Sequence, residues 1–111
     1  GRHVLDAASG EGYGAALLAR SAVSVLGVDL SAEAVAHAQA RYGSPRLRFE
    51  QGDVLRLDGV ADASIDLVVS FETLEHLADH DALLSAFARV LKPDGLLLVS
   101  TPDRHTYSEL A

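Results

Sequence analysis

Short apolar runs rich in Val, Ile and Leu alternate with helix-forming runs along the whole chain, and this alternation restricts the fold more than any other feature. Strands that alternate with helices favour a parallel sheet with right-handed crossovers, because each helix carries the chain back across the sheet. The expected strands cover residues 3–6, 23–28, 47–52, 65–71 and 96–100, and the expected helices residues 15–20, 32–42 and 83–91. We therefore predict one α/β domain with a doubly wound parallel sheet.

Acidic residues stand at the carboxyl ends of the first four expected strands. They are Asp6, Asp29, Asp53 and Glu72. The carboxyl ends of parallel strands meet at one edge of the sheet, where open α/β sheets bind their ligands. Four carboxylates at one edge repel one another unless a positive group is bound among them. S-adenosylmethionine fits such an edge, because it carries a sulfonium and an ammonium, and its ribose hydroxyls and adenine amino group donate hydrogen bonds.

A glycine-rich turn over residues 8–14 joins the first strand to the first helix. Glycine lets the backbone approach a ligand closely, and the N–H groups at the start of a helix are free to bind one. Gly10, Gly12 and Ala15 also satisfy the dinucleotide pattern G-x-G-x-x-[G/A]. Asp6 and Glu11 would repel a pyrophosphate at the helix start, which favours S-adenosylmethionine over a dinucleotide. A turn that only connects strand and helix is the remaining alternative.

The chain resembles the class I methyltransferases in five segments, which occur in the family's order and spacing. Residues 4–12 resemble motif I, 27–31 motif II, 51–54 motif III, 66–77 motif IV of the small-molecule branch, and 91–99 the turn and strand that follow. The resemblance covers nearly the whole chain. It implies a Rossmann-like fold and S-adenosylmethionine-dependent methyl transfer. The family's sheet has seven strands, and the last two are expected to be absent here.

The resemblance assigns one group of residues to the methionine end of the cofactor. Asp6 would hold the ammonium, and the backbone of the glycine-rich turn would wrap the methionine chain. Ala8 departs from the family pattern, since a glycine usually stands at this position, and its methyl group limits the closest backbone approach. The residues of this group are Asp6, Ala8, Ser9, Gly10, Gly12, Ser70, Phe71 and Glu72.

A second group is assigned by the resemblance to the adenosine end. Asp29 would accept both ribose hydroxyls, and Leu30 would pack on the adenine ring. Asp53 would accept from the adenine amino group, with Val54 beside it.

His76 is the candidate catalytic base, because it follows the fourth strand by a few residues and so comes near the methyl donor. Methyl transfer needs a base only if the acceptor must lose a proton, and the alternative is that His76 packs between Leu74 and Leu77 and orients a loop. A metal site could be drawn from Glu72, Glu75 and His76, but their spacing is not that of a helical zinc site. We therefore expect no metal.

The composition excludes several other classes of function. The chain has 9 basic and 16 acidic residues, a net charge of −7, which argues against nucleic-acid binding. There is no cysteine, so disulfides and thiolate zinc sites are excluded and a reducing, cytoplasmic location is expected. No apolar run approaches the ~20 residues of a membrane span.

Three hypotheses about function remain open on the sequence alone. The leading one is a methyltransferase acting on a small molecule or a sugar, since the tail at 100–108 resembles methyltransferases of glycan clusters. The alternatives are an NAD-dependent oxidoreductase and a non-catalytic nucleotide-binding domain.

The 111 residues are expected to be the cofactor-binding core of a longer polypeptide, because they contain no Met and only five expected strands. The fifth strand would then expose unpaired backbone groups over residues 96–100, where another chain could pair.

Overall fold

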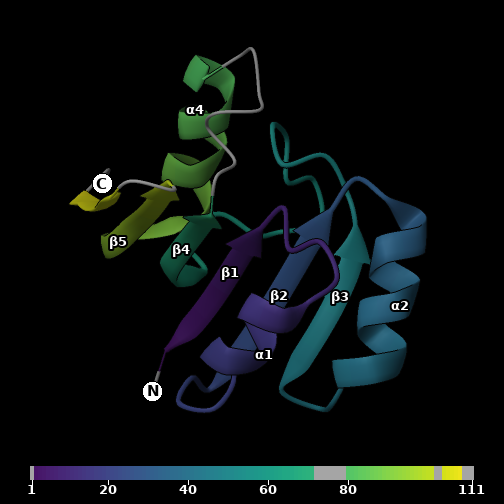
Figure 1. The fold of residues 1–111 in the computed structure, drawn as a ribbon. Coiled ribbons are helices and arrows are strands. Elements are labelled where there is room, and N and C mark those ends of the chain that lie inside the picture. The colour runs from purple at the N-terminus through teal and green to yellow at the C-terminus, as the bar shows by residue number, and fades with distance from the viewer. Residues whose placement is uncertain (1, 72–79, 102–103, 109–111) are drawn as a thin grey trace.

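The computed structural model describes residues 2–71, 80–101 and 104–108. Within these ranges one sheet runs in the order β3-β2-β1-β4-β5-β6. Its strands are β1 His3–Ala7, β2 Ser24–Asp29, β3 Leu47–Gln51, β4 Ile65–Phe71, β5 Leu91–Thr101 and β6 Arg104–Ser108. The helices are α1 Tyr13–Leu18, α2 Ala32–Tyr42 and α4 His80–Val90, and Figure 1 shows how they flank the sheet.

β1 to β5 are parallel, and β1 lies in the middle of the sheet between β2 and β4. In this register Asp6 lies opposite Gly27 on one side and Val69 on the other. The order of the strands reverses at β1 and β4, since the chain moves outward from β1 to β3 and then returns to the other side of β1. A ligand crevice in such sheets lies at this switch point, beyond the carboxyl ends.

Each face of the sheet is covered by its own apolar layer. On one face Val25 and Phe49 pack with Ala15 of α1 and Ala38 of α2. On the other face Leu5 and Val68 pack with residues of α4, among them Leu83 and Phe87. Helices on both faces of a parallel sheet make the doubly wound, Rossmann-like fold that was predicted.

The boundary between α4 and β5 differs from the prediction. The helix ends at Val90, and the strand begins at once with Leu91. Leu91 pairs with Ile65, but Leu96 pairs with Leu67, so β5 carries extra residues in an irregular register. The turn expected between the helix and residues 96–100 is therefore part of the strand, and its extra residues form an irregularity like a β-bulge.

The expectation of an unpaired edge on the fifth strand was wrong. β6 pairs with β5 in antiparallel fashion from Leu97 to Thr101, and it is the sixth strand of the described sheet. The polar sequence of β6 concealed it, because a strand at the edge of a sheet needs only one row of backbone bonds and no buried apolar run. Among the described helices, none has the length and apolar character required to cross a bilayer.

Candidate cofactor-binding site

The glycine-rich turn between β1 and α1 adopts left-handed backbone at Ala8 (φ 59°), Gly10 (φ 57°) and Gly12 (φ 91°). The Ser9 amide donates to the Val28 carbonyl at 3.0 Å, and the Gly12 amide donates to the Ser9 carbonyl at 3.1 Å. The turn thus curls over the end of β2. Alanine in the left-handed region costs about 1–2 kcal/mol, so the departure at Ala8 introduces backbone strain as well as a methyl group.

Gly10 and Gly12 serve different purposes. A Cβ placed on Gly10 would meet no atom of the described residues within 4 Å, so this position leaves room there for a ligand to approach the backbone. A Cβ on Gly12 would lie 2.8 Å from both the Ala38 Cβ and the Phe49 Cζ. Gly12 therefore allows close packing of α1 against α2 and the sheet, and Gly10 provides the opening.

Asp29, the last residue of β2, holds the turn in place. Its Oδ2 accepts from the Gly10 amide at 2.8 Å, and its Oδ1 accepts from the Ser31 amide at 2.9 Å. Each carboxylate oxygen can accept a second hydrogen bond, so both remain available to a diol. Asp29 thus fixes the glycine-rich turn and offers its free lone pairs beside it.

Asp6 lies in the penultimate position of β1 and is 2% exposed. No hydrogen-bond partner for its side chain occurs among the residues that the structure describes. Burial, with a smaller contribution from the Asp29 charge, raises the pKa of Asp6 to about 7. A buried carboxylate without a partner is strongly unfavourable, so this position calls for a cationic ligand.

Two buried hydroxyls near the same edge, the Ser9 Oγ and the Ser70 Oγ, have no hydrogen-bond partner in the part of the chain that the structure describes. Ser70 is fully buried and lies opposite Ala7 in the register of β4 on β1. The Ser9 Oγ is 2.9 Å from the place that a Cβ on Gly27 would occupy, which puts it between the turn and β2. Unpaired buried hydroxyls are rare and mark a site whose polar groups are left for a ligand.

The adenosine side is formed by the ends of β2 and β3. Leu30 is 70% exposed, which suits packing on a flat ring. The Asp53 Oδ1 accepts from the Leu55 amide at 2.9 Å, and this contact fixes the carboxylate at the start of a turn. The side chain of Val54 packs in the core on the α4 face, so only its backbone remains at the edge.

Gln51 was not anticipated in the sequence analysis. Its Nε2 donates to the Leu30 carbonyl at 3.2 Å, and the Gly52 amide donates to the Asp29 carbonyl at 2.9 Å. These bonds join the ends of β2 and β3 on the adenosine side. A glutamine after a strand carries no sequence signal for this role.

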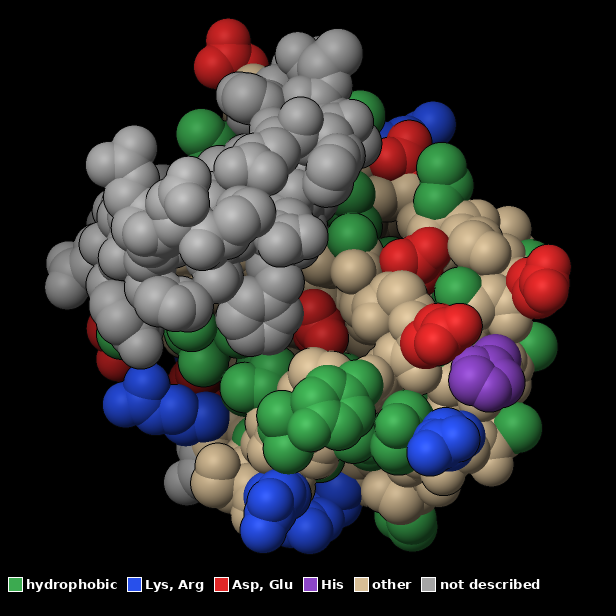
Figure 2. All heavy atoms as spheres, in the orientation of Figure 1, with side chains coloured by type: hydrophobic (Ala, Val, Ile, Leu, Met, Phe, Trp, Pro, Cys, Tyr) green, Lys and Arg blue, Asp and Glu red, His purple; other side chains and the backbone are tan. Residues whose placement is uncertain are grey.

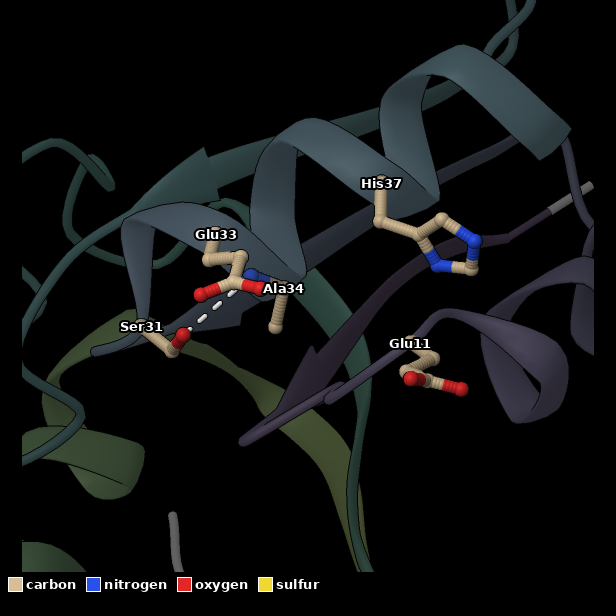
Figure 3. Close-up of a pocket in the computed structure, with 5 residues that line it drawn as sticks. All are labelled: Glu11, Ser31, Glu33, Ala34 and His37. Carbon is tan, nitrogen blue, oxygen red and sulfur yellow. Dashed lines mark hydrogen bonds between the residues drawn. The ribbon is translucent and has the colours of Figure 1, made fainter.

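A groove of about 530 Å³ lies on the outer side of the glycine-rich turn, between the turn and α2 (Figure 3). Glu11 from the turn and Glu33 from α2 line it, with His37 one turn further along the helix. Ser31 caps α2 by accepting from the Ala34 amide at 3.1 Å. Two carboxylates beside these helix starts disfavour a phosphate group there, which argues against the dinucleotide interpretation.

Acidic side chains gather on the same part of the surface. Figure 2 shows them around the ends of the strands near α2, with Lys and Arg side chains lying mainly lower on this face. Of the four predicted acids, Asp6, Asp29 and Asp53 lie at the carboxyl edge, while Glu72 falls outside the described residues, as do Glu75 and His76. The backbone of Phe71 ends β4 at this edge. No group of three metal-ligating side chains occurs in the described ranges.

Comparison with known proteins decides the family. The family model of the methyltransferase domain matches residues 5–99. This chain belongs to the class I S-adenosylmethionine-dependent methyltransferases. The resemblance found in the sequence is thereby confirmed, and the Rossmann-like fold is the one that this family uses.

Two relatives illustrate the similarity in sequence. A protein of Mycolicibacterium smegmatis, named a probable S-adenosylmethionine-dependent methyltransferase, is 48% identical over 108 residues, which are 97% of this chain and 41% of the relative. Trans-aconitate 2-methyltransferase of Deinococcus radiodurans is 40% identical over 107 residues, 95% of this chain and 40% of the relative. The chain therefore spans about two fifths of the length of these relatives.

A solved structure shows the same fold. Phosphoethanolamine N-methyltransferase 2 of Haemonchus contortus, in complex with S-adenosyl-L-methionine, superposes with a TM-score of 0.82 at 33% identity. The match covers 89% of this chain and 24% of that protein.

Proposed function

We propose that residues 1–111 form the cofactor-binding core of an enzyme that transfers a methyl group from S-adenosylmethionine to a small-molecule or glycan acceptor. Asp6 carries the proposal, because it is a buried carboxyl with no hydrogen-bond partner among the described residues, and it lies near Asp29, which binds the Gly10 amide. An ammonium group at this place would relieve the unfavourable burial of the Asp6 charge. The family membership and the relatives named for S-adenosylmethionine support the same cofactor.

The residues at the edge fit the chemical groups of this cofactor. Asp6 and the turn would hold the methionine end, Asp29 the ribose hydroxyls, and Leu30 and Asp53 the adenine. When bound, S-adenosylmethionine supplies an electrophilic methyl group on its sulfonium. The work of the chain is then to hold the donor in one orientation and to exclude water, since positioning is the main source of rate in a displacement of this kind.

His76 is proposed as the residue that takes a proton from a hydroxyl or amine acceptor. An imidazole ionises near neutral pH, so a base of this kind gives the rate a sigmoidal rise with pH. Replacement by Gln should remove that rise in the full-length enzyme. A variant that retains the pH profile would assign His76 a structural role.

A cytoplasmic location is proposed from the cysteine-free composition. The acceptor is proposed only as a class, a small molecule or a sugar. Relatives with similar cores are named for trans-aconitate and for phosphoethanolamine, so a core of this kind serves different acceptors.

Calorimetry with S-adenosylhomocysteine and with NAD tests the cofactor. We expect S-adenosylhomocysteine to bind and NAD not to bind.

Asp29→Ala should weaken the binding of S-adenosylhomocysteine at least tenfold, because it removes charge-assisted hydrogen bonds to the ribose and releases the Gly10 amide. Asp58→Ala is the matched control, since Asp58 is exposed and pairs with Arg56 on the surface.

Tighter binding of NAD than of S-adenosylhomocysteine would favour the oxidoreductase alternative. Cofactor binding without turnover by the full-length protein would favour a non-catalytic domain.

A further inference from the structure

Arg89, in the last turn of α4, binds a segment that lies about 30 positions earlier in the chain. Its Nη1 donates to the Val60 carbonyl at 2.9 Å and to the Asp62 carboxylate. Its Nη2 donates to the Leu57 carbonyl at 2.6 Å and to the Arg56 carbonyl at 3.3 Å. A cation in the last turn of a helix ordinarily faces that helix's own carbonyls. Here the guanidinium instead donates hydrogen bonds to the carbonyls of a different segment.

The segment in question connects β3 to β4 over residues 52–64 and contains neither helix nor strand. Leu57 and Val60 are 3% and 7% exposed, so the segment is drawn into the core on the α4 face. Buried carbonyls need hydrogen-bond donors; within the segment the Val60 amide donates to the Leu57 carbonyl at 3.0 Å, and further donors come from outside it. Arg89 provides them with its side chain, and its own carbonyl accepts from the Ala63 amide at 2.9 Å.

Leu57 links this contact to the proposed adenine site. Its amide donates to the Asp53 carbonyl at 2.8 Å, which closes a turn over residues 53–57. Leu57 has left-handed backbone (φ 51°), a conformation that a leucine holds only when its surroundings enforce it. The Asp53 Oδ1 is bound inside the same turn by the Leu55 amide, which leaves its other oxygen for a ligand. The orientation of that oxygen therefore depends on the turn.

We propose that Arg89 is a positioning residue for adenine recognition: it holds the 53–57 turn, and through it the Asp53 carboxylate, in the orientation that accepts the adenine amino group. This inference rests on the proposed function, and it adds a residue that touches no part of the cofactor. An arginine is required because one planar guanidinium must reach three carbonyls and a carboxylate at once.

Two ligands separate positioning from stability. S-adenosylhomocysteine carries the adenine amino group, and S-inosylhomocysteine carries a carbonyl oxygen there and cannot donate. The wild type should prefer the first ligand, and Asp53→Asn should abolish most of that preference. Arg89→Ala and Arg89→Lys should each weaken the binding of S-adenosylhomocysteine about tenfold, the equivalent of 1.4 kcal/mol. The affinity for S-inosylhomocysteine should change little. In the Asp53→Asn background, Arg89→Lys should have almost no further effect on either affinity.

Controls distinguish the possible failures. Arg48→Ala removes an exposed arginine that pairs with Glu50, and Asp62→Asn removes only the charge partner of Arg89. Both should leave the ligand preference within about twofold of wild type, since exposed pairs contribute little. A loss of thermal stability in Arg89→Lys with an unchanged ligand preference would overturn the inference, as would an unchanged preference in Asp53→Asn. If the wild type bound neither ligand, the proposed function itself would fail.

Discussion

At the carboxyl edge of the sheet Asp6 is buried without a hydrogen-bond partner in the described residues, whereas at the amino edge Asp66 accepts from two donors. The His3 amide donates to the Asp66 Oδ2 at 2.8 Å, and the Lys92 ammonium lies 3.1 Å from its Oδ1. The pKa of Asp6 is raised by burial, and the pKa of Asp66 is lowered, chiefly by the hydrogen bond from the His3 backbone. The same residue type thus meets opposite environments at the two ends of one sheet.

The difference extends beyond the two aspartates. The carboxyl edge also holds the unpaired hydroxyl of Ser70 and the left-handed Ala8, while at the amino edge His3 and Ser24 share a hydrogen bond of 2.6 Å. Polar groups left unpaired and strained backbone are typical of binding sites, where a ligand later compensates for them. The amino edge supplies stability that the carboxyl edge lacks.

The largest expected effect comes from removing the Asp6 charge. The folded pKa of about 7 lies above the ordinary value of 3.8, so the folded chain holds a proton that the unfolded chain releases between these values. The wild type therefore loses stability as the pH rises from about 4 to about 7, by about 4 kcal/mol in total from this residue. The Asp6→Asn variant should not show this loss of stability, and it should bind S-adenosylhomocysteine more weakly.

Urea unfolding of both proteins at pH 5 and pH 8 measures this effect, because the difference between them isolates Asp6 from the other titrating groups. The variant should be the more stable protein at pH 8. Equal dependence on pH in the two proteins would show that the Asp6 charge is not buried as described.

Asp66→Asn should have the next largest effect, with the opposite sign. It removes a charge-assisted hydrogen bond and an ion pair at a side chain that is 22% exposed, so unfolding should become easier by about 1–2 kcal/mol at pH 7. Because the folded pKa of Asp66 is lowered, this contribution is present above pH 4 and is lost as the pH falls through the folded value. Asp58→Asn, at a side chain that is 73% exposed, should change little. Similar losses of stability in Asp66→Asn and Asp58→Asn would contradict the contrast drawn between the two edges of the sheet.

Ser70→Ala should raise the stability of the ligand-free chain by about 1 kcal/mol, because it removes a buried hydroxyl that has no partner within the described ranges. Ser64→Ala is the control at the other end of β4. The Ser64 Oγ donates to the Ala61 carbonyl at 2.7 Å, so that variant should lose stability. Thermal unfolding of the two variants, with and without S-adenosylhomocysteine, measures these changes in stability. Destabilisation by Ser70→Ala would mean that the hydroxyl is already satisfied.

Ala8→Gly should have the smallest effect. It relieves left-handed strain of about 1–2 kcal/mol but adds about 0.5–1 kcal/mol of chain entropy to the unfolded state, so the gain should be about 0.5 kcal/mol. Ala63→Gly, at φ 49° near the amino edge, should give a similar gain. Only the first variant should alter the affinity for S-adenosylhomocysteine. An altered affinity in Ala63→Gly would show that this test does not separate the two edges.

The sequence was sufficient for the elements that obey a clear periodicity. The strand Ile65–Phe71 was predicted with its observed bounds, and so was the helix Ala32–Tyr42. The acids Asp6, Asp29 and Asp53 were placed at one edge, because parallel strands bring their carboxyl ends together.

Other features depend on contacts that no local pattern records. An arginine such as Arg89 on a helix ordinarily faces solvent, and its carbonyl partners lie far away in the chain. The β6 strand follows a polar sequence, so it lacks the apolar run by which the other strands were found. The opposite environments of Asp6 and Asp66 arise from burial, which the residue type alone does not reveal.

The central place of β1 also governs the order in which the crevice can form. β1 can pair with β2 as soon as both are synthesised, but its other neighbour, β4, begins only at Ile65. Closing that pair brings together segments far apart in the chain, and contacts of this kind form slowly because the loop entropy must be lost first. During synthesis, the ends of β1 and β2, which form one side of the crevice, are therefore complete before β4, which forms the other side, has been made. The growing chain passes through a stage in which β1 is an exposed edge, open to pairing with a neighbouring strand, and the arrival of β4 ends it.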